Sequence, residues 1–458
     1  MEATALTDIA ANLQQIMLRA MGFDAPVENI ARLSGGANME SSSFDHAGSG
    51  YVLRRAPSAE FMAGRVYGHD VEAAVVRAAF AAGVKAPEVV AELTPEDNFG
   101  TGYIMRRVEG EVNPTKILAA PPPSLLHDFA REAARIHAIP LDCIPALPQP
   151  TPNELLAEMM ARFVTYGGDR PVFALAFRWL EDHLPAPVAP VLLHGDFRMG
   201  NIMVDANGLA AVLDWELAHL GDRHQDLAFG CINSWRFGHI DRPAFGVGPL
   251  DDLWAAYERE SGVAVEPARF RWWLVYSTLW WGLCCLQMAE IWRSGADASL
   301  ERAVIGRRAS ETEVDLLMLL EGDAPESERG LFALLEANPV RRLGEPSSAE
   351  MLEALAKWVE EDVKAGAEGR DRFMAAVALN ALGMLKRDAE HPVAAYDREL
   401  SDALLAGTTG LSTPGLLAKL KATALTKLAV DQPKYSALAK ARAMWLDPQT
   451  NRVDQNPR

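Results

Sequence analysis

Three polar side chains recur at intervals that could support a chemical reaction. Asp196 is followed five residues later by Asn201, and Asp214 comes thirteen residues after Asn201. Residues 202–213 between them are typical of a strand, an Asp/Asn/Gly turn and a second strand, a hairpin that would return Asp214 to the side of Asn201. A converging carboxylate and amide oxygen suit Mg²⁺, and Asp196 could accept a proton from an attacking hydroxyl, as phosphoryl transfer requires. The alternative is that all three are ordinary turn formers.

Three neighbours of this loop also have expected roles. We interpret His194 as a scaffold residue that bonds the loop backbone, rather than as an acid or base. Arg198, two residues after Asp196, could contact the transferred phosphate, and a plain surface arginine is the alternative. Asp226 is expected to brace the loop without reacting.

Phosphoryl transfer also predicts nucleotide-binding parts upstream of the loop. Ser34, Gly35 and Gly36 lie between two strand candidates, where glycines would let backbone N–H groups approach phosphates. Gly-Gly is a common turn as well, so this signal depends on its position. Backbone groups near Arg106 to Val108 fall where adenine would be bound, an inference from position only.

A cation on a strand and a carboxylate on a helix should accompany the glycine-rich turn. Arg54 follows the strand candidate 51–53, and its guanidinium can grip two oxygens at once. Glu72 is the best candidate to hold Arg54, with Asp70 second. A solvated helix face is the alternative for Glu72.

The surrounding pattern predicts a mixed α+β chain of three parts. Residues 1–108 form a small β-rich N-lobe that binds nucleotide, residues 109–335 a mainly helical lobe for catalysis and substrate, and residues 345–458 an all-helical accessory domain. Linker breaks at 323–328 and 344–346 separate the last two parts. The expected strands are 30–33, 51–53, 89–93 and 102–105, and the expected helices include 8–22, 68–82, 124–138, 153–183, 371–387, 393–406 and 414–429.

The composition narrows the class of partner and the compartment. A net charge of −18 over 458 residues argues against nucleic acid and anionic membranes, which need clustered positive charge. Four cysteines without a Cys-x-x-Cys pair, and a start without a signal peptide, fit a reducing cytoplasm. The uncharged stretch 272–289 is predicted to be a buried helix rather than a membrane span.

The loop resembles the catalytic loop of protein kinases, where an Asn follows the catalytic Asp by five positions and a metal-binding Asp-Phe-Gly comes later. Here Gly195 replaces the loop Arg, and Asp214-Trp215-Glu216 replaces Asp-Phe-Gly. These departures are typical of aminoglycoside-phosphotransferase-like small-molecule kinases. The resemblance implies a bilobal kinase-like fold that uses ATP and Mg²⁺. Because the loop Arg usually meets an activation-loop phosphate, we expect no such switch.

Residues from about 28 to 320 are also similar to kinase domains that are fused to, or work with, acyl-CoA dehydrogenases. That resemblance implies phosphorylation of the hydroxyl of a 4-hydroxyacyl-CoA in hydroxy-acid catabolism, after which a dehydrogenase-like partner eliminates phosphate. The part from about 345 resembles a small protein that accompanies such kinases as a separate chain. The matching segments are 33–36, 52–55, 194–201, 212–222, 305–308 and, in the accessory part, 373–382.

Two other functions stay open at this point. One is an antibiotic kinase of the aminoglycoside or macrolide type, and the other is a pseudokinase scaffold, against which the intact polar set of the loop argues. The tryptophans between 272 and 281 could line an acyl pocket, although helical core is the simpler interpretation. The arginines available for CoA phosphates are Arg236, Arg271, Arg293, Arg302, Arg307 and Arg308.

Overall fold

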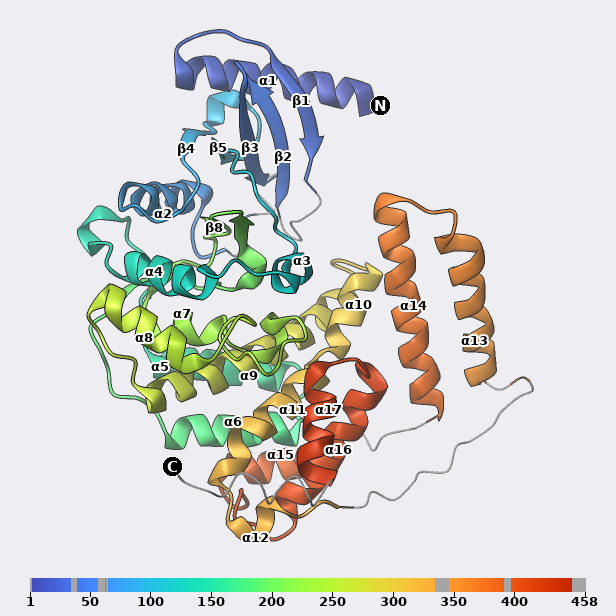
Figure 1. The fold of residues 1–458 in the computed structure, drawn as a ribbon. Helices are drawn as coiled ribbons and strands as arrows, with labels where there is room; N and C mark the ends of the chain where they lie inside the picture. The colour runs from blue at the N-terminus through green and yellow to red at the C-terminus, as the bar shows by residue number, and fades with distance from the viewer. Residues whose placement is uncertain are drawn as a thin grey trace.

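The computed structural model describes residues 2–33, 39–56, 62, 65–333, 346, 348–390 and 397–446. A small lobe built on a five-stranded sheet lies against a larger helical lobe, and the C-terminal helices pack beside and beyond the helical lobe (Figure 1). The predicted α+β, two-lobe architecture with C-terminal helices is confirmed.

The small lobe is one antiparallel sheet with the strand order β1-β2-β3-β5-β4. Tyr51 and Leu53 alternate along β3 and reach a core that contains Phe44, Ile104 and the helical residue Leu13. β2 was not predicted, because its sequence Glu-Ser-Ser-Ser-Phe-Asp-His carries little apolar pattern. The elements are α1 (Glu2–Met21), β1 (Val27–Arg32), β2 (Glu40–His46), β3 (Ser49–Ala56), α2 (His69–Ala81), β4 (Val89–Glu92) and β5 (Thr101–Arg106).

The long helix α9 (Pro267–Arg293) runs through the core of the helical lobe. Trp272 and Trp273 are each 1% exposed. Their indole N–H groups donate to the Leu180 carbonyl and to Asp222 Oδ2, both at 3.0 Å. The prediction of a buried helix is therefore confirmed for this stretch. Among the helices that the structure describes, none has the length and apolarity that a bilayer crossing needs.

The helix predicted over 153–183 is in fact two helices, α5 (Pro152–Thr165) and α6 (Pro171–Asp182). Gly167 and Gly168 both have positive φ, which ends α5, and a proline at the first position of α6 starts a new helix. The other helices of this lobe are α3 (Pro114–Ala119), α4 (Leu125–His137), α7 (Arg223–Phe229), α8 (Leu250–Ser261), α10 (Leu300–Arg307), α11 (Ala309–Leu320) and α12 (Glu326–Arg329).

Two short antiparallel strand pairs hold the loop that carries the polar triplet. β6 (Val191–Leu193) pairs with β9 (His219–Gly221), and β7 (Ile202–Asp205) pairs with β8 (Gly208–Val212). The Leu213 N–H, just after β8, donates to the Asn201 carbonyl at 2.8 Å. The predicted hairpin is confirmed, and it returns the chain to Asn201.

The C-terminal helices divide into two groups. α13 (Ser348–Trp358) and α14 (Gly369–Glu390) form a hairpin at the side of the molecule, whereas α15 (Arg398–Leu405), α16 (Leu416–Asp431) and α17 (Ser436–Leu446) pack on the helical lobe (Figure 1). Leu428 of α16 belongs to the same buried cluster as Leu317 of α11. Buried Glu313 of α11 pairs with Arg170 at 2.7 Å and with Lys427 of α16 at 2.6 Å. The accessory-domain boundary stays a prediction, but α15 to α17 share the core of the helical lobe.

This shared core leads to a stability prediction. Leu428→Ala, which empties a site that is 0% exposed, should lower the free energy of unfolding by about 2–5 kcal/mol. Leu355→Ala on α13, at a site 46% exposed, is the control and should cost less than about 0.5 kcal/mol. Urea unfolding measures both variants. An independently folded C-terminal part would contradict the shared core, because Leu428→Ala would then shift only one of two separate transitions.

Candidate active site

The loop after β6 depends on a glycine and a buried histidine. Gly195 has φ +81°, and a side chain there would place its Cβ 2.1 Å from the Leu217 carbonyl oxygen. His194 Nε2 donates to the Leu213 carbonyl at 3.0 Å, and its Nδ1 accepts the Asp196 N–H at 3.2 Å. Burial lowers the pKa of His194, so the ring stays neutral. His194 thus has the scaffold role expected from sequence.

Asp226 of α7 fixes the same loop by accepting hydrogen bonds from its backbone. One carboxylate oxygen accepts the His194 N–H at 2.7 Å, and the other accepts the Gly195 N–H at 2.9 Å. Burial would raise the pKa of Asp226, but its hydrogen bond with His137 and the charge interaction with that ring hold the pKa below its usual value. The expected bracing role of Asp226 is confirmed by these contacts.

The carboxylate of Asp196 is held between Arg198 and Asn201. Arg198 Nε donates to Asp196 Oδ1 at 2.7 Å, and the guanidinium lies 4.5 Å from the centre of the Trp235 ring. Asn201 Nδ2 donates to the Asp196 carbonyl at 3.0 Å and also to its carboxylate. Burial raises the pKa of Asp196, and Arg198 opposes that shift. Arg198 is therefore the ion-pair partner of Asp196, not a plain surface arginine.

Asn201 and Asp214 present the oxygen atoms that a magnesium site needs. Because both hydrogen bonds of the Asn201 side chain to described residues use Nδ2, its Oδ1 is left to face a ligand. Asp214 has φ +67°, unusual for a residue with a side chain, and its side chain is 34% exposed. One carboxylate and one amide oxygen fit Mg²⁺ when nucleotide phosphates supply further ligands. The described residues contain no group of three His, Cys, Asp or Glu side chains that could hold a metal ion without such further ligands.

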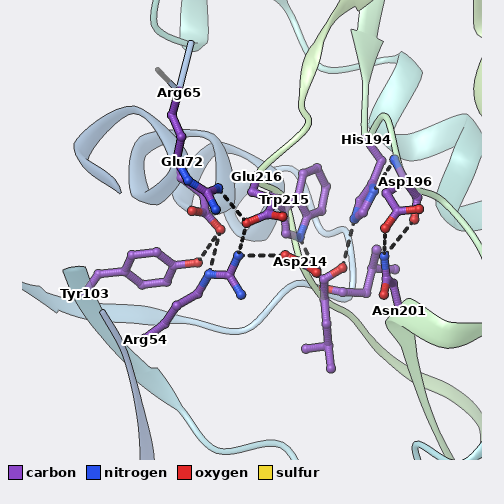
Figure 2. A network of polar contacts seen from close by, with 12 residues as sticks. Arg54, Arg65, Glu72, Tyr103, His194, Asp196, Asn201, Asp214, Trp215 and Glu216 are labelled. Atoms are coloured by element: carbon purple, nitrogen blue, oxygen red, sulfur yellow. Dashed lines mark hydrogen bonds and ion pairs between the residues drawn. The ribbon is translucent and has the colours of Figure 1, made fainter. Parts of the chain in front are cut away.

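Arg54 joins the sheet to this oxygen site (Figure 2). Its Nε lies 3.1 Å from Glu72 Oε1, and its Nη2 lies 2.7 Å from Asp214 Oδ1 and 3.0 Å from Glu216 Oε2. The Tyr103 hydroxyl donates to Glu72 at 3.0 Å. Although burial lowers the pKa of Arg54, the carboxylates around it raise that pKa above its ordinary value. Burial raises the pKa of Glu72.

The geometry explains why this position carries arginine. The guanidinium contacts Glu72 through Nε and the other two carboxylates through a separate nitrogen, a span that the compact ammonium of lysine does not have. Asp70, the second candidate, makes no contact with Arg54 among the described interactions. Glu216, which also pairs with Arg65 at 2.9 Å, was missed from sequence. The sequence signals that could have found Glu216 were its position directly after Asp214-Trp215 and the arginine at position 54, whose guanidinium can bind several oxygens at once.

The remaining nucleotide-site expectations fare differently. Ser34, Gly35 and Gly36 lie outside the described residues. We expected backbone groups near Arg106 to meet adenine. The Arg106 N–H instead donates to the Glu88 carbonyl at 2.8 Å, so this N–H is not open to a ligand. In the described structure, the N–H of Val108 has no acceptor and remains available.

A cavity of about 420 Å³ borders the loop at Gly195. The wall of this cavity is largely apolar and includes Leu155, Phe229, Tyr276 and Trp280. The tryptophan run therefore splits between the two interpretations, because the first pair lies in the core and Trp280 faces the cavity.

The six arginines considered for CoA phosphates lie apart from that wall, and each already has a partner. Arg236 donates to two backbone carbonyls, and the other five pair with carboxylates. The described residues therefore show no unpaired arginine of this set that could form a ready phosphate site. The six are Arg236, Arg271, Arg293, Arg302, Arg307 and Arg308.

Comparison with known proteins finds two family models in the chain. One, described as the phosphotransferase enzyme family, matches residues 29–273, and the other, a domain of unknown function (DUF6285), matches residues 389–435. The acyl-CoA dehydrogenase family member 10 of Mus musculus is 27% identical over 224 residues, which cover 42% of this chain and 20% of that protein. This chain thus spans about a fifth of the length of that relative.

Solved structures give the fold. An aminoglycoside-phosphotransferase-like protein of Ralstonia eutropha JMP134 superposes with a TM-score of 0.55 at 21% identity, covering 68% of this chain and 98% of that one. Aminoglycoside phosphotransferase APH(4)-Ia, in a complex with AMP-PNP and hygromycin B, gives a TM-score of 0.43 at 18% identity over 67% of this chain and 98% of that one. The first likeness shows the kinase-like fold.

The Arg54 cluster leads to a pH prediction through its neighbour His69, which is 3% exposed. Burial, helped by the charges of Arg54 and Arg65, lowers the pKa of His69 to about 4. In the unfolded chain His69 binds a proton near pH 6.5, whereas in the folded protein it does so only near pH 4. The free energy of unfolding therefore falls by roughly 3 kcal/mol as the pH drops from 6.5 to about 4.

His69→Phe should flatten this part of the stability profile, whereas His127→Gln, at a half-exposed histidine, should leave it unchanged. Urea unfolding at pH 7 and pH 4.5 measures the difference. Equal pH dependence in the wild type and His69→Phe would show that His69 is not the group responsible.

Proposed function

This chain belongs to the phosphotransferase enzyme family and is a small-molecule phosphotransferase, and we propose that it uses ATP and Mg²⁺ to phosphorylate the hydroxyl of a 4-hydroxyacyl-CoA. The observation that carries the proposal is the convergence of Asp196, Asn201 and Asp214 on one loop and hairpin, tied to Arg54 of the sheet. These groups supply a base, metal ligands and a phosphate-binding cation.

Asp196 is the proposed base. Its pKa is raised by burial, and Asn201 and Arg198 fix its carboxylate, so it can orient the acceptor hydroxyl and take its proton. Asn201 Oδ1 and the Asp214 carboxylate would hold Mg²⁺, which supplies positive charge against the phosphates when bound. Arg198 would contact the transferred phosphoryl group from its place beside the base.

Arg54 is the proposed contact for the other nucleotide phosphates. Its link to Asp214 occupies one oxygen of the proposed metal carboxylate, so nucleotide and metal binding would have to redistribute this contact. Glu72 and Glu216 would keep the guanidinium in place during the exchange. The glycine-rich turn at Ser34, Gly35 and Gly36, with the backbone N–H of Val108, completes the proposed ATP site.

The acyl-CoA substrate is supported by the largely apolar cavity at Gly195 and by a relative named as an acyl-CoA dehydrogenase family member. A dehydrogenase-like partner that eliminates the phosphate, and a cytoplasmic location, belong to the same proposal. One observation favours a second candidate, an aminoglycoside-type kinase. Exposed Glu158 also borders the cavity and would suit a cationic amino sugar.

The decisive experiment is ATP consumption against a panel of hydroxyacyl-CoAs, free hydroxy acids, aminoglycosides and macrolides. We expect turnover with 4-hydroxyacyl-CoAs and a phosphorylated hydroxyl in the product. Turnover only with an amino sugar would exclude the acyl-CoA substrate. No turnover with any acceptor would favour the pseudokinase alternative.

Asp196→Asn should lower kcat about 10²–10⁴-fold, because the amide cannot take the hydroxyl proton. The fold should survive, since an amide retains the shape and its one oxygen can still accept from Arg198, while Asn201 keeps its hydrogen bond to the backbone carbonyl of residue 196. Phosphate transfer and thermal unfolding are measured on the same preparation. Unchanged turnover would mean that Asp196 is not the base.

Arg54→Lys should lower kcat/KM for ATP about 10–100-fold, because lysine keeps the charge but cannot reach Glu72 and Asp214 in the same way. The matched control is Arg55→Lys, whose arginine pairs instead with Glu40 at 2.9 Å. ATP kinetics compare the two variants. Equal effects at both positions would remove the special role given to Arg54.

A further inference from the structure

Three buried polar atoms without a partner belong to residues that line the cavity at Gly195. His219 Nε2, Gln225 Oε1 and Ser277 Oγ have no hydrogen-bond partner among the residues that the structure describes, and all three residues line the cavity. Buried polar groups in proteins are nearly always bonded, and each unpaired one costs free energy. Three such atoms in one cavity wall therefore indicate a ligand.

The chemistry of the three atoms defines what they can bind. His219 Nδ1 lies 2.8 Å from the Leu217 carbonyl, which can only accept, so Nδ1 carries the proton and Nε2 offers a lone pair. Gln225 Oε1 is also an acceptor, whereas the Ser277 hydroxyl can donate. The set comprises two acceptors and one donor.

The surroundings favour a neutral ligand group. Phe229 and Trp280 pack edge to face at 5.5 Å between ring centres and contribute apolar surface beside the trio. Glu72 and Glu216 also border the cavity, but both are paired with Arg54. Arg65 on the same wall pairs with Glu216, and Glu158 is exposed to solvent. A neutral amide matches the trio, because its N–H can donate to His219 or Gln225 while its carbonyl accepts from Ser277.

We propose that His219, Gln225 and Ser277 form a subsite that binds an amide group on the otherwise apolar acceptor substrate. The inference rests on the proposed function in one respect: the pantetheine arm of an acyl-CoA is the source of that amide. The trio comes from β9, α7 and α9, so the fold assembles it from three separate elements. It would set specificity for the acceptor, without taking part in the chemistry at Asp196.

The test compares one 4-hydroxyacyl group as its N-acetylcysteamine thioester, which has an amide, and as its butyl thioester, which has none. We expect wild-type kcat/KM to favour the amide thioester at least about tenfold, and Gln225→Leu combined with Ser277→Ala to bring this ratio close to one. Ser294→Ala, at the exposed end of α9, is the control and should keep the wild-type ratio. An unchanged ratio in the double variant would overturn the subsite.

Direct binding separates this inference from the proposed reaction. If neither thioester is phosphorylated, the proposed function fails, and equilibrium binding of pantetheine still tests the subsite. Binding to the wild type that weakens at least about tenfold in the double variant supports it. Three results would overturn it: no binding of pantetheine to the wild type, equal binding to both proteins, or binding of an amino sugar in place of pantetheine. If pantetheine does not bind to the wild type, only water is left as the partner of the three polar atoms.

Discussion

The contact of one arginine with three carboxylates is the interaction on which the site depends. Arg54 lies on β3 of the small lobe, Glu72 lies on α2, and Asp214 and Glu216 follow the hairpin of the helical lobe. A buried cation depends on the acids around it, because an unpaired buried charge is costly. The cluster therefore sets the position of the sheet relative to Asp196 and its neighbours.

The second constraint is the set of contacts that supports the catalytic loop and connects it to the C-terminal helices. Asp226 and the glycine at 195 fix the backbone, and Trp235 supports Arg198. Trp235 follows Ser234, whose hydroxyl meets the Tyr435 hydroxyl at 3.4 Å, and Tyr435 also donates to buried Asp315 at 2.6 Å. The helices after residue 397 thus contact the segment that supports the arginine beside the base.

Sequence reasoning found the parts whose signal is local. The spacing of Asp196, Asn201 and Asp214, with turn residues between them, predicted the hairpin. A cation on a strand followed by an acid on a helix predicted Arg54 and Glu72 as a pair. The roles in nucleotide and metal binding remain predictions. Polar β2 and the break within 153–183 were missed, because hydrophobic periodicity barely marks a serine-rich strand or a glycine pair between two apolar helices. Glu216 and the cavity trio depend on distant elements that meet only in the fold.

The central claim is that Arg54 acts on the nucleotide as part of one cluster with Glu216. A double-mutant cycle with Arg54→Lys and Glu216→Gln, measured as kcat/KM for ATP, tests it most directly. We predict that the double variant loses less than the sum of the single losses, by at least about 1 kcal/mol of coupling, because either change disrupts the same contact. Additive losses, within about 0.3 kcal/mol, would contradict the claim.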